Sequence, residues 1–139
     1  MTYRYVLGLF LISFTLILAA CGGSTGPGSQ EVQVTLSEFK VTSSVTTFSP
    51  GTSYRFVVTN NGQVPHEFMI MPEGMNMTGM SMDEMHKMAL AMIDNVAPGE
   101  TKTIDYTFAS SNPGQNFEFA CHLPGHYEAG MKLPIMVNK

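Results

Sequence analysis

The residues of this chain that can do chemistry are concentrated in one stretch near the C-terminus, residues 121–131. Its side chains include one thiol, two imidazoles and a thioether, contributed by Cys121, His122, His126 and Met131. Pro124, Gly125 and Gly130 interrupt the stretch and allow the backbone to bend, so that several side chains can converge on one point. Soft sulfur ligands select copper or zinc, and a thiolate with imidazoles and one weak thioether is the ligand set of a mononuclear electron-transfer copper site. A further imidazole from elsewhere is needed, and His66 is the leading candidate.

The first twenty residues predict a secretory signal. Arg4 lies in a short cationic start, and residues 6–18 are almost wholly apolar but too few for a membrane span. The run ending in Cys21 (Leu-Ala-Ala-Cys) resembles the bacterial lipoprotein box, in which the cysteine becomes the lipidated first residue of the mature protein. The alternative is an ordinary signal that is cleaved after Ala20 and leaves Cys21 as a stray thiol. We expect residues 1–20 to be a lipoprotein signal peptide and Cys21 to anchor the protein to a membrane outside the cytoplasm, in the periplasm or at the outer face of the cell membrane.

The cysteine count constrains the role of Cys121. The chain has two cysteines, so lipidation of Cys21 leaves Cys121 without a partner for an internal disulfide. In an oxidising compartment a free thiol is either buried as a small apolar group or bound to metal. A lone cysteine is usually inert, and a lone histidine on a strand is seldom a ligand. The combination of Cys121, His126, Met131 and a distant His66 therefore carries the prediction of a mononuclear metal site.

Composition divides the chain into three parts and excludes one class of partner. Residues 21–30 are rich in Gly, Ser, Thr and Pro and form a flexible tether, and residues 31–139 form one domain. Without Arg4, six basic residues face eleven acidic ones, which gives a net charge of about −5. A domain of this charge does not favour nucleic acid, whose phosphates require a basic surface. It also gains nothing from anionic lipid, so membrane attachment would rest on the lipid at Cys21.

Short segments of alternating apolar and polar residues predict strands separated by turns. They comprise residues 31–36, 54–59, 65–71, 101–108, 116–121 and 133–137. The first strand continues through residue 41 after a phase shift at residues 37–38, which predicts a bulge there. We expect an all-β, antiparallel β-sandwich of about seven or eight strands with one short inserted helix. The chain has neither a Gly-rich nucleotide-binding turn nor a nucleophile elbow, and we expect it not to be an enzyme.

Methionine is concentrated in residues 69–92, beside His86. Ser81 and Glu84 fit a capping box, which predicts a helix over residues 82–93. Thioethers bind Cu(I), and the spacing of several of them is typical of segments that handle copper, namely Met75, Met77, Met80 and Met82. These residues either bind a second copper ion as Cu(I) or fill gaps over the sandwich as flexible apolar side chains.

The pattern of these ligands resembles that of the cupredoxins, the small blue-copper proteins of the plastocyanin, azurin and auracyanin kind. His66, Cys121, His126 and Met131 stand where that family places its four ligands, with four residues between Cys and His and four between His and Met, as in auracyanin and rusticyanin. The resemblance covers most of residues 31–139 and implies a Greek-key β-sandwich. Gly125 stands where a binuclear site would have a second cysteine, so we expect one type 1 copper ion.

The resemblance implies one-electron transfer between Cu(II) and Cu(I) on a membrane-anchored, monomeric carrier. Its partners would be redox proteins such as a cytochrome or an oxidase complex, which meet an apolar patch around His126 formed with Pro124, Gly125 and Tyr127. The alternative is a protein that stores copper or delivers it to an acceptor through residues 69–92. The carrier would bind one copper ion, whereas the storage or delivery protein would bind additional Cu(I) in residues 69–92.

Three residues near the ligands depart from the family pattern or add to it. Many cupredoxins have Asn directly after the first His, where it ties the ligand loops together, and this chain has Glu67. His122 follows Cys121 directly, and neighbouring side chains on extended backbone point to opposite faces. We therefore expect His122 to support the site or lie at the surface, and Glu67, His122 and His86 to be either supporting groups or ligands of extra copper.

Overall fold

The computed structural model describes residues 28–75, 77, 79–110 and 114–138. The predicted signal peptide and Cys21 lie outside the described residues. Nine strands and one helix follow each other along the described chain: β1 (Gln30–Ser37), β2 (Lys40–Ser43), β3 (Thr47–Phe48), β4 (Ser53–Asn60), β5 (His66–Pro72), α1 (Met82–Met88), β6 (Ala91–Val96), β7 (Thr101–Thr107), β8 (Asn116–Ala120) and β9 (Lys132–Val137). Within this part of the chain, no helix is long and apolar enough to cross a membrane.

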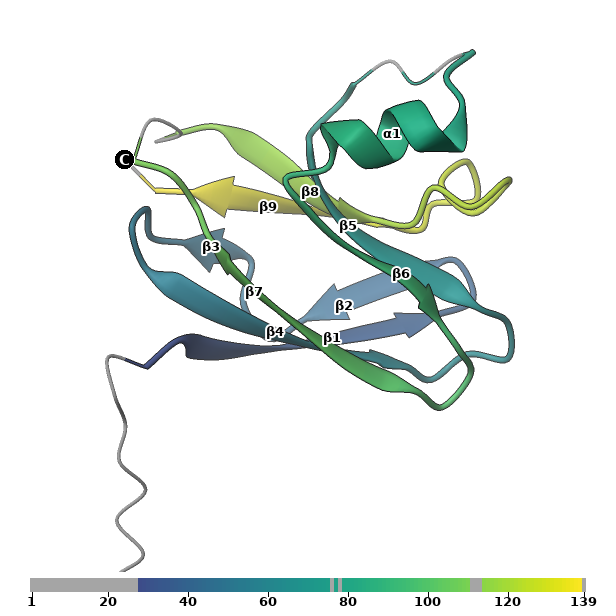
Figure 1. Ribbon diagram of the computed structural model, residues 1–139, viewed down its shortest axis with the longest axis horizontal. Helices are drawn as coiled ribbons and strands as arrows, with labels where there is room; N and C mark the ends of the chain where they lie inside the picture. Colours follow the sequence, from purple (N-terminus) through teal and green to yellow (C-terminus); the bar gives the residue numbers. More distant parts are fainter. Residues whose placement is uncertain (1–27, 76, 78, 111–113, 139) are drawn as a thin grey trace, which may run out of the picture.

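The strands form two facing sheets, as the alternating pattern predicts. One sheet has the order β2-β1-β4-β7 and the other the order β3-β9-β8-β5-β6 (Figure 1). The predicted β-sandwich with one short inserted helix is therefore confirmed. Most strand pairs are antiparallel, as predicted, whereas β1 pairs with β4 and β3 pairs with β9 in parallel.

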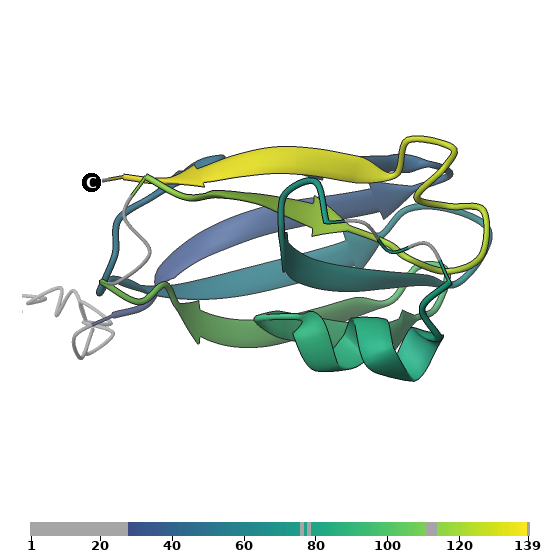
Figure 2. The same cartoon turned by 90° about the horizontal axis from the view of Figure 1, so that it is seen from above.

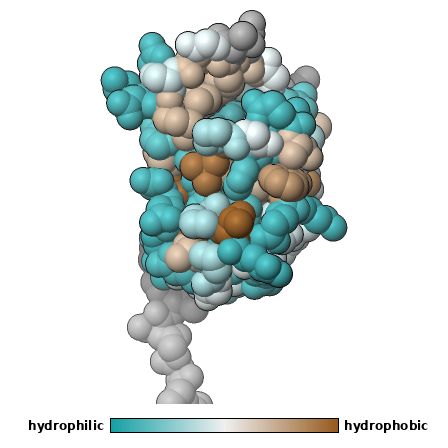
Figure 3. Space-filling view, turned by 90° about the vertical axis from the view of Figure 1, so that its right-hand side faces the viewer, coloured by the Kyte–Doolittle hydropathy of each residue, from teal (hydrophilic) through white to brown (hydrophobic). Residues whose placement is uncertain are grey.

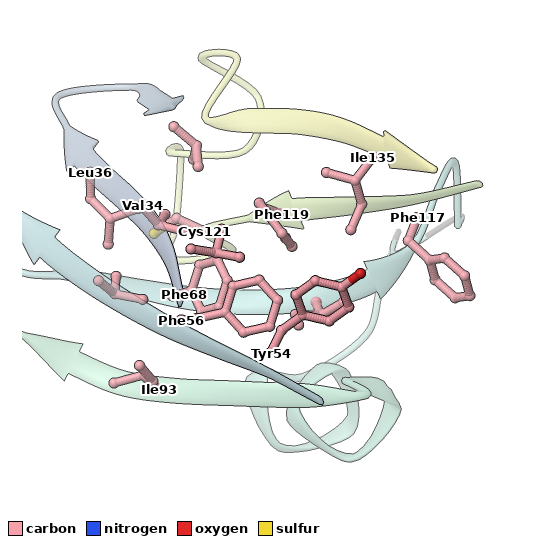
Figure 4. Packing of buried hydrophobic residues seen from close by; sticks show 14 of the residues in the cluster. Val34, Leu36, Tyr54, Phe56, Phe68, Ile93, Phe117, Phe119, Cys121 and Ile135 are labelled. Carbon is pink, nitrogen blue, oxygen red and sulfur yellow. The ribbon is translucent and has the colours of Figure 1, made fainter. Parts of the chain in front are cut away.

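The core lies between the two sheets and is rich in aromatic side chains. Residues that alternate along β1, β4, β5 and β8 point inward, and the fully buried rings include Phe48, Phe56, Phe68 and Phe119. Burial of one such ring contributes about 1.5–3 kcal/mol of hydrophobic stabilisation. Cys121 belongs to this cluster, and Figure 4 shows it just beyond Phe119. One of the predicted metal ligands is therefore part of the hydrophobic core.

Two details of the predicted elements are wrong. Instead of a bulge, a tight turn at residues 38–39 ends β1 and starts β2, and Phe39 in this turn has a positive φ of 58°. The helix has the predicted capping box at Ser81 and Glu84, but it ends at Met88 instead of residue 93. Pairing of β6 with β5, which includes Met69 with Met92, overrides the helical propensity of the last residues.

Strand β5 is buried on both faces. Phe68 and Ile70 belong to the core cluster, whereas Glu67 and Met69 alternate with them and point to the opposite face of the sheet, yet all four are completely buried. Helix α1 and its flanking loops lie over this outer face (Figures 1 and 2), and the N–H of Leu90 donates to the carbonyl of Ile70 at 2.9 Å. The inserted segment thus covers the outer face of β5, an interior strand of its sheet.

Candidate metal centre

The fold brings the predicted ligands to one end of the sandwich. His66 is the first residue of β5, and Cys121 directly follows β8, the antiparallel neighbour of β5. His126 and Met131 lie in the connection from β8 to β9, which Figure 1 shows projecting from the same end. Cys121, His66 and Met131 are fully buried, while His126 is partly exposed.

The ligand atoms of three of these residues face one another. Nδ1 of His66 lies 3.2 Å from Nδ1 of His126, and Sγ of Cys121 lies 3.4 Å from the same nitrogen. All three atoms lie within 4.8 Å of one another. Two atoms that bind one metal ion at about 2.0–2.3 Å are separated by such distances, so the residues present fit a single ion of the copper or zinc size.

Backbone hydrogen bonds close the loop that carries three of the ligands. The N–H of Cys121 donates to the carbonyl of Met131 at 3.1 Å, and the N–H of Met131 donates to the carbonyl of His126 at 3.0 Å. Gly125 and Gly130 have φ values of 84° and 100°, which side chains with a Cβ rarely adopt. The glycines noticed in the sequence therefore allow the turns that bring Met131 back beside Cys121.

Burial sets the protonation of the ligands in the absence of metal. Burial lowers the pKa of His66, and the nearby His126 lowers it further, which favours the neutral imidazole that binds metal. Burial raises the pKa of the Cys121 thiol, and the backbone N–H groups of Glu67 and Leu123 partly oppose this effect. Metal binding must therefore displace a proton from Cys121, and these N–H groups are already placed to stabilise the thiolate.

Two polar residues that the sequence did not single out hold the segment before His66. Asn60 is fully buried and donates from Nδ2 to the carbonyls of Val64 and Val96, at 2.8 and 2.9 Å, and its Oδ1 accepts the N–H of Gly62 at 2.8 Å. Glu38 accepts N–H groups from Gln63 and Val64. Asn60 contacts both the loop that follows it and the distant Val96, whereas both partners of Glu38 lie about 25 residues away in the sequence.

Phe39 contacts the exposed side of His126. The two rings meet edge to face with centroids 5.4 Å apart, and Phe39 is 47% exposed. Figure 3 shows this end of the molecule, where separate hydrophobic spots lie within a mainly hydrophilic surface. The surface around His126 thus includes Phe39, which sequence reasoning missed, in addition to the predicted Pro124 and Gly125.

Glu67 lies between helix α1 and the loop of residues 121–131, which carries three of the predicted ligands and which we call the copper loop. Its Oε1 accepts the N–H of His122 at 2.7 Å, and its Oε2 lies 3.2 Å from Nε2 of His86. The structure therefore places Glu67 and His86 beside the centre and in contact with each other.

His122 lies outside the group of facing ligand atoms. Its ring stacks on Tyr127 with centroids 4.4 Å apart, and its Nε2 is buried without a hydrogen-bond partner among the described residues. His122 therefore turns away from the ligand cluster, toward Tyr127.

The predicted methionine ligands line a groove beside the loop. This groove, which we call the methionine groove, has a volume of about 710 Å³. Its walls include Met75, Met77, Met80, Met82 and Met85 from the inserted segment and His122 and Tyr127 from the copper loop. The methionines thus line the same groove as His122, whereas Nε2 of His86 lies 3.2 Å from Glu67.

Comparison with known proteins gives one family. The model of the copper binding proteins of the plastocyanin/azurin family matches residues 28–138. The chain is 35% identical over 125 residues to the "Copper-resistant cuproprotein CopI" of Vibrio cholerae serotype O1 (strain ATCC 39315 / El Tor Inaba N16961), covering 78% of this chain and 68% of the relative. It is 30% identical over 123 residues to the protein of the same name from Rubrivivax gelatinosus, covering 84% of this chain and 71% of the relative.

Solved structures support the fold. A reduced auracyanin from Roseiflexus castenholzii is similar with a TM-score of 0.62 at 20% identity, covering 82% of this chain and 100% of that one. An azurin (Az-iso2) from Methylomonas sp. strain J is similar with a TM-score of 0.59 at 16% identity, covering 81% and 100%. Together with the facing ligand atoms, the family match identifies a type 1 copper site formed by His66, Cys121, His126 and Met131.

Proposed function

The chain belongs to the plastocyanin/azurin family of copper-binding proteins, and on this premise we propose that it is a carrier of single electrons and not an enzyme. The observation that carries the proposal is the arrangement of Nδ1 of His66, Nδ1 of His126 and Sγ of Cys121, which all lie within 4.8 Å of one another. Copper bound by such a set gains or loses one electron. A buried and prearranged set of ligands needs little rearrangement when the charge changes.

The partly exposed edge of His126 is the proposed route for the electron. The other ligands are fully buried, so a partner approaches the copper most closely over His126 and the adjacent Phe39. We propose that the partner is a cytochrome or an oxidase complex, and that the carrier is a monomer. A lipid on Cys21 would hold it outside the cytoplasm, at the membrane where such partners lie.

A copper titration followed by electron transfer tests this function. The protein should bind one Cu(II) and show an intense visible charge-transfer band, and the reduced form should pass one electron to added cytochrome c. Cys121→Ser should remove the band and the transfer, whereas Cys21→Ser should leave both unchanged. A holoprotein without colour, or a coloured one that cannot be reduced reversibly, would refute the carrier function.

The methionine groove favours a second candidate function, copper storage or delivery. Five methionines and His122 line one groove, and thioether and imidazole groups suit Cu(I). Two relatives are named as copper-resistant cuproproteins. We propose that this groove binds one Cu(I) in addition to the copper of the type 1 site and releases it to an acceptor.

Metal counting separates the two functions. With Cu(I) supplied in a competition with a chromophoric chelator, the protein should bind two ions. A variant with Met80, Met82 and Met85 replaced by leucine should bind one Cu(I) ion. When it is loaded with Cu(II) instead, the variant should keep its visible charge-transfer band. The exposed Met136→Leu is the control and should still bind two ions. Equal Cu(I) counts in the triple variant and the control would reject the storage function and leave the carrier function intact.

A further inference from the structure

Glu67 is a fully buried acid directly after a copper ligand. It lies where β5 and β6 lose their regular register, between His66 and Phe68, and its side chain points to the outer face of the sheet. Helix α1 and its flanking loops cover this face. A buried carboxylate is costly unless hydrogen bonds compensate for the lost water, so its partners reveal why it is tolerated.

Both carboxylate oxygens have a partner, and the two partners belong to different segments. Oε1 accepts the N–H of His122, the residue that follows Cys121, at 2.7 Å. Oε2 lies 3.2 Å from Nε2 of His86 in α1, whose side chain is 27% exposed. Because a carboxylate accepts hydrogen bonds and does not donate them, Nε2 of His86 is the donor. Glu67 therefore joins the copper loop to the inserted helix.

The backbone of Glu67 is also directed at the metal site. Its N–H points to Sγ of Cys121 at 3.5 Å, while its side chain holds the N–H of the next residue in the copper loop. Glu67 therefore contacts Cys121 in two ways: its own N–H points to the sulfur, and its carboxylate holds the N–H that follows Cys121 in the chain. An amide side chain at this position could accept the same hydrogen bond, so the feature that Glu67 adds is a negative charge.

We propose that Glu67 is a positioning residue through which helix α1 sets the reduction potential of the copper centre. Its charge favours Cu(II) over Cu(I), since the oxidised centre carries one more positive charge. His86 holds the carboxylate in place and offsets part of its charge. This inference rests on the proposed redox cycling of copper and assigns to the inserted segment a function besides covering the sheet.

The charge effect is large enough to measure. At an effective dielectric constant of about 20, a full charge changes the energy of another a few ångströms away by kilocalories per mole. Glu67→Gln removes the charge and keeps an oxygen that can accept the N–H of His122. We expect the equilibrium constant for reduction to rise at least about tenfold, equivalent to ~59 mV for one electron. The charge-transfer band should keep its position, because Cys121, His66 and His126 are unchanged.

The role of His86 requires a double-mutant cycle. His86→Ala should lower the reduction potential, because the carboxylate loses the donor that offsets its charge. His86→Gln, which restores a donor, should recover most of the shift. In the Glu67→Gln background, His86→Ala should change the equilibrium constant less than twofold. Lys87→Ala, which removes an exposed charge from the same helix, is the control and should not depend on residue 67.

The potentials are measured at an electrode, without a protein partner, and the thermal unfolding of each copper-free variant is recorded beside them. A twofold or smaller change for Glu67→Gln with an unaltered band, or an equal shift for His86→Ala in both backgrounds, would overturn this inference. If Glu67→Gln bound no copper, the His86→Ala and His86→Gln pair would still decide the coupling by a loss and recovery of the shift. Failure of the unmutated protein to cycle reversibly would instead refute the proposed function.

Discussion

Nδ1 of His66 lies 3.2 Å from Nδ1 of His126, although 60 residues separate them in the chain. One ring is fully buried at the start of β5, and the other is partly exposed in the loop before β9. The core and the loop hydrogen bonds therefore hold two imidazoles side by side that lie far apart in the sequence. We therefore expect substitutions at and around this pair to change copper binding, the reduction potential and the stability of the fold.

Copper should stabilise the fold through this pair. An ion that binds only the native state stabilises it by about 2.7 kcal/mol at a free concentration 100 times its dissociation constant. Differential scanning calorimetry should show a large rise in the melting temperature on addition of Cu(II). His66→Ala should lose most of this rise, whereas His86→Gln, outside the ligand cluster, should keep it. An undiminished rise in His66→Ala would exclude His66 as a ligand.

Met131 should tune the potential without holding the fold together. Leucine has a similar volume, so Met131→Leu should cost less than about 1.5 kcal/mol in the free energy of unfolding. Loss of a weak axial donor favours Cu(I), and cyclic voltammetry should therefore show a higher reduction potential. The exposed Met136→Leu provides the control. An unchanged potential in Met131→Leu would show that the thioether does not interact with the metal.

Asn60 should be among the polar residues that matter most for stability. Its amide makes three hydrogen bonds in a fully buried place, and Asn60→Ala leaves the carbonyl of Val96 without its donor. We expect a loss of about 2–4 kcal/mol in urea unfolding. The exposed neighbour Asn61→Ala should change stability by less than about 0.5 kcal/mol. Similar effects of the two substitutions would contradict the role of Asn60.

Glu38 should make the loop before His66 sensitive to acid. The N–H of Gln63 is the main cause that lowers the pKa of Glu38 from its ordinary value of 4.5. A lowered pKa in the folded state means that stability is present above pH 4.5 and is lost as the pH falls through the folded value. Copper-free Glu38→Gln should therefore melt at a lower temperature than the unmutated protein at pH 7. This difference should shrink below pH 4.5, and a difference independent of pH would refute the role of the charge.

Phe39 should protect the copper at some conformational cost. Its positive φ costs about 1–3 kcal/mol for a residue with a side chain, and glycine removes that cost. Phe39→Gly should leave the stability of the copper-free protein within about 1 kcal/mol, because the lost ring contact is worth a similar amount. Copper should nevertheless pass to a chelator several times faster. Asn95→Gly, at the other positive-φ residue among those described that is not glycine, should leave this rate unchanged.

The ligands could be predicted because their types and spacing are local, apart from His66, and because soft ligands identify the metal class. The capping box of α1 was predicted for the same reason, since Ser81 and Glu84 contact each other within one turn. The supporting residues could not be predicted in this way. Glu38 and Phe39 contact residues of other elements, as Asn60 does at Val96, and none of these residue types has a sequence signature for such a distant contact. The end of the helix was missed because strand pairing outweighs propensity.

The inserted segment leaves and re-enters the sheet at neighbouring points. The N–H of Leu90 bonds to the carbonyl of Ile70, and Ile70 pairs with Ala91, so the β5–β6 hairpin is closed beneath the segment. Lengthening such an excursion costs little extra closure entropy, since that cost grows only with the logarithm of length. A segment of another length can therefore join these points without shifting the register of β5, provided that it still covers Glu67 and Met69 and supplies a partner for the Glu67 carboxylate. The scaffold offers a grafting position at which new metal-binding or docking sequences can be placed close to the type 1 copper site.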